Sequence, residues 1–268
     1  MRVAPRCEVL VRRSDVDRIL THLLPLVAMA RAGIAAEPAG LPEAPFAVVE
    51  LYTSEGCSSC PPADRILAGL AGAARRDGRR VFPLSFHVDY WDRLGWRDPF
   101  GDPAHARRQS RYAGAFASRY TPQMVVNGGE SFVGSDAPRV TRSIEAALAR
   151  SAPVAVRMRL EPIATDSVRV RWETSSSPRG AELHSAIVER SLTSDVERGE
   201  NRGRTLQHEN VVRLFRTITL NQSTSGRITL AIPAGVRPEN ASVIVFVQDT
   251  RRHTILGAAM ADFPAGPR

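Results

Sequence analysis

Two cysteines, separated by two serines, stand where an apolar strand should pass into a helix, and this arrangement constrains the fold more than any other feature of the chain. The pair, Cys57 and Cys60, follows the apolar run 46–52 after a short polar turn, and a helix-like segment, 61–75, comes next. The free amides at a helix N-terminus stabilise a thiolate, which is the reactive form of cysteine. The position of the pair therefore predicts reactive thiols.

The hydrophobic pattern between residues 46 and 150 predicts alternating strands and helices. We expect strands over residues 46–52, 79–88, 124–127 and 131–133, and helices over residues 61–75, 103–118 and 136–150. Asp136 or Ser135 can cap the last helix. A C-x-x-C motif beside a β-α-β unit is typical of thioredoxin-like redox proteins. The whole order, β-α-β, an inserted helix and then β-β-α, predicts an α/β thioredoxin-like domain with a helical insertion.

After residue 151 the pattern changes to short alternating or β-branched runs separated by turn residues. We expect strands over residues 154–161, 168–174, 184–191, 211–220, 227–232, 242–249 and 255–261. Short strands with regular turn signals predict an all-β, sandwich-like domain. The predicted organisation is a thioredoxin-like domain over residues 46–150, followed by a β-sandwich domain over residues 151–268.

The N-terminus has the features of an export signal. Two arginines at positions 12 and 13 precede a mostly apolar stretch, 19–30, and small residues follow up to Ala36. We therefore expect a leader over residues 1–36, a linker over residues 37–45 and a periplasmic or secreted protein. The apolar stretch is too short and too interrupted for a stable membrane span. Removal of the leader would also remove Cys7, which leaves Cys57 and Cys60 as the cysteines of the mature chain.

The basic residues exclude several enzyme classes. All 36 residues counted as Lys or Arg are arginines, and the net charge is +8. A chain without lysine cannot carry a Walker A lysine, a Schiff-base lysine or a kinase strand lysine. The arginines are scattered over both halves, with no run of interleaved aromatic residues, so we expect no nucleic-acid partner.

The cysteine pair suggests a mechanism of disulfide exchange. Cys57, the N-terminal and more exposed member, would attack a substrate disulfide, and Cys60 would then resolve the mixed disulfide. Pro122 stands just before a predicted strand, where thioredoxin-like proteins carry a cis-proline beside the disulfide. Thr121 would then present its backbone to the substrate, so the predicted catalytic set is Cys57, Cys60, Thr121 and Pro122.

The residues around the pair leave the direction of exchange open. The hydroxyls of Ser58 and Ser59 can stabilise a thiolate, whereas the charge of Glu55 opposes it. Glu50, in the preceding strand, is either a proton acceptor for Cys60 or a carboxylate paired with an arginine. These alternatives cannot be separated from the sequence.

A second set of side chains follows the second predicted strand. His87 is a base or ligand beside the disulfide, or a structural histidine. The aromatic residues Tyr90, Trp91 and Trp96 line a substrate groove or pack the inserted helix onto the sheet. An arginine cluster on that helix is interpreted as a solvated face; its members are Arg107, Arg108 and Arg111.

Two other classes of function compete with disulfide exchange. One is a non-catalytic binding module that keeps the fold as a scaffold. The other is a copper or zinc carrier that uses Cys57, Cys60 and His87, with Asp89 or His105 as a fourth ligand. The leading interpretation needs neither a cofactor nor a metal, and its partner is a protein or small molecule that carries a thiol or disulfide. The oligomeric state is not predicted.

Several long motifs resemble a known family. They are LYTSEGCSSCPPAD (51–64), HVDYWD (87–92), LGW (94–96), DPF (98–100), YTPQMVVNG (120–128), GENRGRTL (199–206) and HENVV (208–212). They resemble the bacterial DUF1223 family of thioredoxin-like, predicted secreted proteins, from about residue 46 to the C-terminus. The resemblance implies a thioredoxin-like fold with the cysteine pair at its active site. It implies no particular substrate, because the function of the family is unknown.

Overall fold

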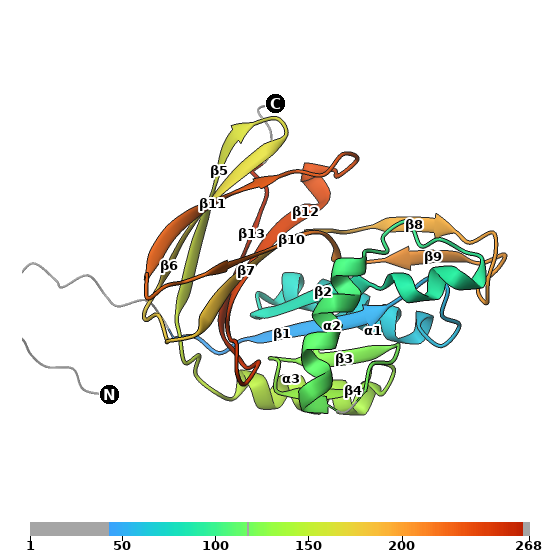
Figure 1. The fold of residues 1–268 in the computed structure, drawn as a ribbon, viewed down its shortest axis with the longest axis horizontal. Helices are drawn as coiled ribbons and strands as arrows, with labels where there is room; N and C mark the ends of the chain where they lie inside the picture. Colours follow the sequence, from blue (N-terminus) through green and yellow to red (C-terminus); the bar gives the residue numbers. More distant parts are fainter. Residues whose placement is uncertain (1–42, 117, 265–268) are drawn as a thin grey trace, which may run out of the picture. The chain divides into compact units, whose positions relative to one another are not determined.

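The computed structural model describes residues 43–116 and 118–264 (Figure 1). The helices and strands of the first half are β1 (Ala47–Thr53), α1 (Pro61–Asp77), β2 (Val81–His87), η1 (Asp89–Leu94), α2 (Pro103–Phe116), β3 (Gln123–Val126), β4 (Glu130–Val133) and α3 (Ala137–Leu148). Those of the second half are β5 (Val156–Ala164), β6 (Ser167–Thr174), β7 (Ala181–Glu189), β8 (Leu192–Asp195), β9 (Thr205–His208), β10 (Val211–Thr219), β11 (Ser225–Ala231), η2 (Pro238–Asn240), β12 (Ala241–Asp249) and β13 (Ile255–Asp262). Here η marks a 3-10 helix.

One large sheet organises these elements. Its eight strands follow the order β13-β12-β7-β10-β2-β1-β3-β4, while β11-β6-β5 form a second sheet and β8-β9 form a hairpin. The described residues thus have a mixed α/β fold with a large central sheet and few helices.

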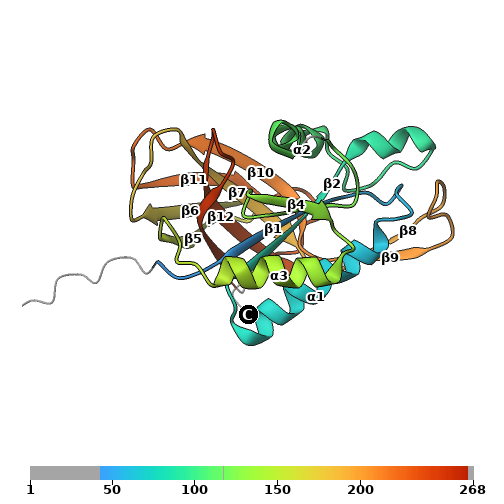
Figure 2. The same cartoon turned by 90° about the horizontal axis from the view of Figure 1, so that it is seen from below.

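The strand β1 lies at the centre of the first half and is buried along its whole length. It pairs in parallel with β2 and antiparallel with β3. Because successive side chains point to opposite faces of a strand, Val49 and Leu51 pack against α1 and α3, whereas Val48 and Tyr52 face α2. Figure 2 shows α1 and α3 on one side of the sheet and α2 on the other. Burial on both faces explains the continuous apolar run from which this strand was predicted.

Strands of the second half extend the same sheet. β10 pairs in parallel with β2, through Val211 opposite Ser85, and β7, β12 and β13 follow as antiparallel neighbours. The small sheet β11-β6-β5 shares an apolar core with this part of the large sheet, built around Val170, Trp172 and Leu183. Strands from both predicted domains therefore lie in one sheet: β1 to β4 from the first, and β7, β10, β12 and β13 from the second.

Every strand and helix predicted from the sequence has a counterpart in the structure. The predicted helix cap is confirmed, since the Asp136 side chain accepts a hydrogen bond from the Arg139 amide. The strands β8 and β9 were not predicted, because they are short and place few apolar residues in a core. The predicted leader, Cys7 and most of the linker lie outside the described residues. Within the described part, no helix has the length and apolar character that crossing a membrane requires.

Candidate functional site

Cys57 and Cys60 form a disulfide in the loop between β1 and α1, with their Cα atoms 5.4 Å apart. Cys60 is the residue directly before α1, and its carbonyl accepts hydrogen bonds from the amides of Ala63 and Asp64. The pair thus lies at a helix N-terminus, as predicted. The expectation that Cys57 is the more exposed cysteine is wrong, because both residues are 0 % exposed.

A hairpin from the second half of the chain bonds to the loop that carries the cysteines. We call residues 192–208, which contain β8, β9 and their connecting turn, the hairpin arm. At its turn, the Asn201 side chain donates to the carbonyl oxygens of Glu55 (2.8 Å) and Cys57 (2.9 Å). Glu200 accepts from the Ser58 amide (2.9 Å) and the Ser58 hydroxyl (2.7 Å). The cysteine loop, which belongs to the first predicted domain, is therefore held by hydrogen bonds from residues of the second predicted domain.

The two serines between the cysteines have different environments. The Ser59 Oγ atom lies 3.3 Å from the Cys57 Sγ atom, within hydrogen-bond reach. The Ser58 hydroxyl is instead bonded to Glu200, and the hydrogen bonds from Ser58 lower the pKa of that carboxyl. Of the two hydroxyls, it is therefore Ser59 that contacts the sulfur.

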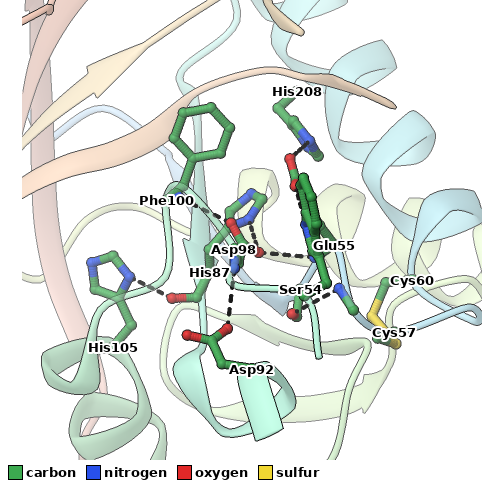
Figure 3. A network of polar contacts seen from close by, with 12 residues as sticks. Ser54, Glu55, Cys57, Cys60, His87, Asp92, Asp98, Phe100, His105 and His208 are labelled. Carbon is green, nitrogen blue, oxygen red and sulfur yellow. Dashed lines mark hydrogen bonds and ion pairs between the residues drawn. A yellow bond between two sulfur atoms is a disulfide. The ribbon is translucent and has the colours of Figure 1, made fainter. Parts of the chain in front are cut away.

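A buried polar network lies beside the disulfide (Figure 3). The Glu55 carboxylate is bonded to His208 of β9 (2.9 Å) and accepts from the Trp96 indole (2.8 Å). The Asp98 carboxylate accepts from the Glu55 amide (2.8 Å) and is bonded to the His87 Nδ1 atom (2.8 Å). These contacts join Glu55, which precedes Cys57 by two residues, to β9 and to the segment after η1, and through Asp98 to His87 at the end of β2.

The ion pair between His87 and Asp98 changes the pKa of both groups. Burial alone would raise the pKa of Asp98, but the charge of His87 and the hydrogen bonds to the carboxylate lower it to about 2. Burial alone would lower the pKa of His87, but the charge of Asp98 and the hydrogen bond to it leave that pKa raised. His87 is thus a structural partner of Asp98 in this network.

Other groups near this network are buried without a hydrogen-bond partner. The atoms are Thr53 Oγ1, Asp64 Oδ1, His87 Nε2 and His208 Nδ1. Burial raises the pKa of Asp64, while the charges of His87 and His208 oppose that rise. Among residues 43–116 and 118–264, no three or more His, Cys, Asp or Glu side chains are grouped so that they could hold a metal ion.

Thr121 and Pro122 lie at the same end of the sheet as the cysteines. The bond between them is cis, as predicted. Tyr52 pairs with Gln123 across the antiparallel strands β1 and β3, so the residues before β3 lie beside the residues after β1. Trp91 links the two segments, because its indole donates to the Thr121 hydroxyl (2.8 Å) and its Cβ atom packs against Gly56.

The aromatic residues of the insertion hold it to the sheet. Trp91 packs on the core beneath α2, Trp96 donates to Glu55, and Tyr90 donates to Gln109 (3.3 Å). These contacts favour the packing alternative over a substrate groove. His105 likewise has an internal partner, since its Nδ1 atom lies 2.8 Å from the His87 carbonyl oxygen.

Glu50 is paired with an arginine. Arg108 donates to its carboxylate from Nε (2.6 Å), and the hydroxyls of Tyr112 (2.5 Å) and Tyr52 (3.1 Å) donate to it as well. Burial alone would lower the pKa of Arg108, but the Glu50 charge raises it. Of the two alternatives for Glu50, the structure shows the ion pair. Arg108 is only 5 % exposed, so interpreting the whole arginine cluster as a solvated face was wrong; only Arg107 and Arg111 are exposed.

Four residues of the site were missed as site residues in the sequence analysis: Asp98, Glu200, Asn201 and His208. All four lie within the motifs DPF, GENRGRTL and HENVV, so the signal was present in the family resemblance. Their spacing from the cysteines gave no sign of contact, since Asn201 is 144 residues from Cys57.

The fold and the site together define a mixed α/β protein with a cysteine pair at a helix N-terminus, and comparison with known proteins identifies the family. The chain matches the model of the family described as "Protein of unknown function (DUF1223)" over residues 48–248, and it belongs to that family. No curated protein matches the chain.

Solved structures provide a further comparison. A crystal structure of a protein from Agrobacterium tumefaciens matches with a TM-score of 0.62 and 26 % identity, covering 84 % of this chain and 97 % of that chain. A domain of the outer membrane lipoprotein Omp28 from Porphyromonas gingivalis matches with a TM-score of 0.26 and 15 % identity, covering 42 % of this chain and 88 % of that domain. The second similarity is too low to carry an argument.

Proposed function

We propose that the chain is an exported thiol-disulfide oxidoreductase that exchanges disulfides through Cys57 and Cys60. The observation that carries the proposal is a disulfide at the junction of β1 and α1, with the cis Thr121–Pro122 bond at the same end of the sheet. The order β4-β3-β1-β2, in which β1 and β2 are parallel and β3 is antiparallel to both of its neighbours, β1 and β4, supports a thioredoxin-like domain. The two sheets that share one apolar core support a sandwich-like second half. The signal-like leader supports export.

In the oxidising direction, a substrate thiolate attacks the Cys57 sulfur. The bond between Cys57 and Cys60 breaks, and Cys60 leaves as a thiolate that takes up a proton. A second substrate thiolate then attacks the substrate sulfur of the mixed disulfide and releases Cys57, which also takes up a proton. Two electrons pass from the substrate dithiol to the protein, and the two protons end on its cysteines. The reverse sequence reduces a substrate disulfide, and the backbone of Thr121 would hold the substrate chain.

The burial of both cysteines favours a second candidate, a non-catalytic binding module. An attacking sulfur must approach the disulfide along the bond that breaks, and a covered pair prevents this approach. The redox proposal therefore requires the cover over Cys57 to open, whereas the binding module does not.

The reduction potential of the pair separates these candidates. In a Cys7→Ser background, equilibration with glutathione should show a two-electron couple between about −270 and −120 mV, the range of known oxidoreductases. The Cys57→Ser variant should show no such couple, and Cys60→Ser should accumulate a mixed disulfide with glutathione. A potential below about −300 mV would indicate a structural disulfide and exclude the redox proposal.

A further inference from the structure

Two residues of the hairpin arm, Asn201 and Glu200, contact the cysteine loop through hydrogen bonds and not through packing alone. Asn201 is fully buried, and its amide donates both hydrogens to main-chain carbonyls on either side of Gly56. Its own Oδ1 atom accepts from Arg204 (3.0 Å), which orients the amide. Asn201 therefore restrains the backbone that carries Cys57.

Glu200 acts on the residue after Cys57. Its carboxylate accepts from both the amide and the hydroxyl of Ser58, and this side chain is exposed to solvent. An amide just beyond the first cysteine of such a motif is a donor that can stabilise a thiolate. Here that amide is already bonded to a carboxylate. The same carboxylate places a negative charge near the position where the thiolate forms.

Both effects act against the reduced, ionised form of Cys57. A thiolate is destabilised when a donor is withheld from it and when a like charge lies close. Destabilising the reduced form shifts the equilibrium toward the disulfide, in contrast to strongly oxidising proteins whose reduced form is stabilised.

We propose that Glu200 and Asn201 are positioning residues of the redox site, supplied by the hairpin arm. Asn201 holds the loop that carries Cys57, and Glu200 biases the pair toward the disulfide and thus toward the reductant direction. This inference rests on the proposed function, because a redox bias matters only if the pair exchanges disulfides. Its test, however, measures the alkylation and the redox equilibrium of the cysteines themselves.

The test uses a series at position 200 in the Cys7→Ser background. Glu200→Gln removes the charge but keeps an oxygen that can accept from Ser58, whereas Glu200→Ala also frees the Ser58 donors. Glu197→Gln is the matched control, because Glu197 is an exposed carboxylate on the same arm and its replacement changes the net charge equally. The measurements are the pH dependence of Cys57 alkylation and the equilibrium with glutathione.

We expect Glu200→Gln to lower the pKa of Cys57 and to increase the ratio of reduced to oxidised protein about threefold. Glu200→Ala should increase this ratio further, to about tenfold, which corresponds to about 30 mV for a two-electron couple. Salt should weaken the Glu200→Gln effect, because the charge is exposed to solvent. The control Glu197→Gln should change neither quantity.

An unchanged alkylation profile and an unchanged ratio in both Glu200 variants would overturn the inference. So would an equal shift in Glu197→Gln, which would show a general charge effect. If the wild-type potential falls below about −300 mV while Glu200→Ala still shifts it, the proposed function fails and the inference about the arm stands. If the wild type exchanges disulfides and the variants match it, the inference fails and the proposed function stands.

Discussion

Arg108→Met should lower the free energy of unfolding by about 3–5 kcal/mol, because it leaves the buried Glu50 carboxylate without its cation. Glu50 is 0 % exposed, and the two tyrosines that remain donate to it without neutralising its charge. The guanidinium also lies over the rings of Phe215 (4.6 Å) and Phe246 (5.2 Å), so its replacement removes cation–π contacts as well. Urea unfolding at neutral pH measures the change.

Arg107→Met is the control for this prediction, since Arg107 is the exposed neighbour on the same helix. It should change stability by less than about 0.5 kcal/mol. The double variant Glu50→Gln/Arg108→Met should recover a large part of the loss, because no unpaired charge remains buried. Equal effects of Arg108→Met and Arg107→Met would contradict the prediction.

Asp98→Asn should destabilise the protein by a similar amount, about 3–5 kcal/mol near pH 6, because it removes one partner of the buried pair with His87. The Asp98 carboxylate also accepts from the amides of Glu55 and Phe100. An asparagine can replace only one of its two oxygens. The loss therefore affects both the ion pair and the backbone that leads into Cys57.

The same variant should change how stability depends on pH. The pKa of Asp98 is depressed to about 2, so the ionised carboxylate stabilises the fold above its unfolded pKa and loses this effect as the pH falls toward 2. This contribution is about 2 kcal/mol. The pKa of His87 is raised in the folded protein. The contribution of its charged form to stability is therefore complete below the pKa of His87 in the unfolded chain, and it is lost as the pH rises through the pKa in the folded protein.

Urea unfolding at pH 2, 5 and 8 checks this pattern. The wild-type protein should be most stable near pH 5, and the difference between the wild type and Asp98→Asn should shrink at both extremes. Asp89→Asn is the matched control, since Asp89 is a partly exposed carboxylate at the start of η1. A constant difference between wild type and Asp98→Asn across the three pH values would argue against the ion pair.

These predictions connect the fold to the proposed chemistry. The pair of Glu50 and Arg108 anchors α2 to β1, and the pair of His87 and Asp98 holds the segment that bonds to Glu55. If the pair of Glu50 and Arg108 is structural, its loss should lower stability without changing the reduction potential of the cysteines in the folded protein. The hairpin arm, in contrast, should change that potential.

Local patterns in the sequence determined the strands, the helices and the place of the cysteine pair. The apolar run that became β1 and the amphipathic pattern of α1 depend on neighbours within a few residues. The cis Thr121–Pro122 bond, in contrast, was predicted from the place where thioredoxin-like proteins carry a cis-proline. The cap at Asp136 is again a local feature. Such features follow from local geometry, so a single sequence is sufficient to predict them.

Only the tertiary structure decided which of these elements meet. No local pattern indicates that β10 pairs with β2, that Arg108 is buried against Glu50, or that the weakly apolar hairpin arm reaches Cys57. Each of these contacts joins residues far apart in the chain, and the free energy that selects them comes from burial and pairing across that distance. The sequence by itself therefore identified the cysteine pair and its place before a helix, and the long-range packing determined that the pair is buried and that the hairpin arm bonds to its loop.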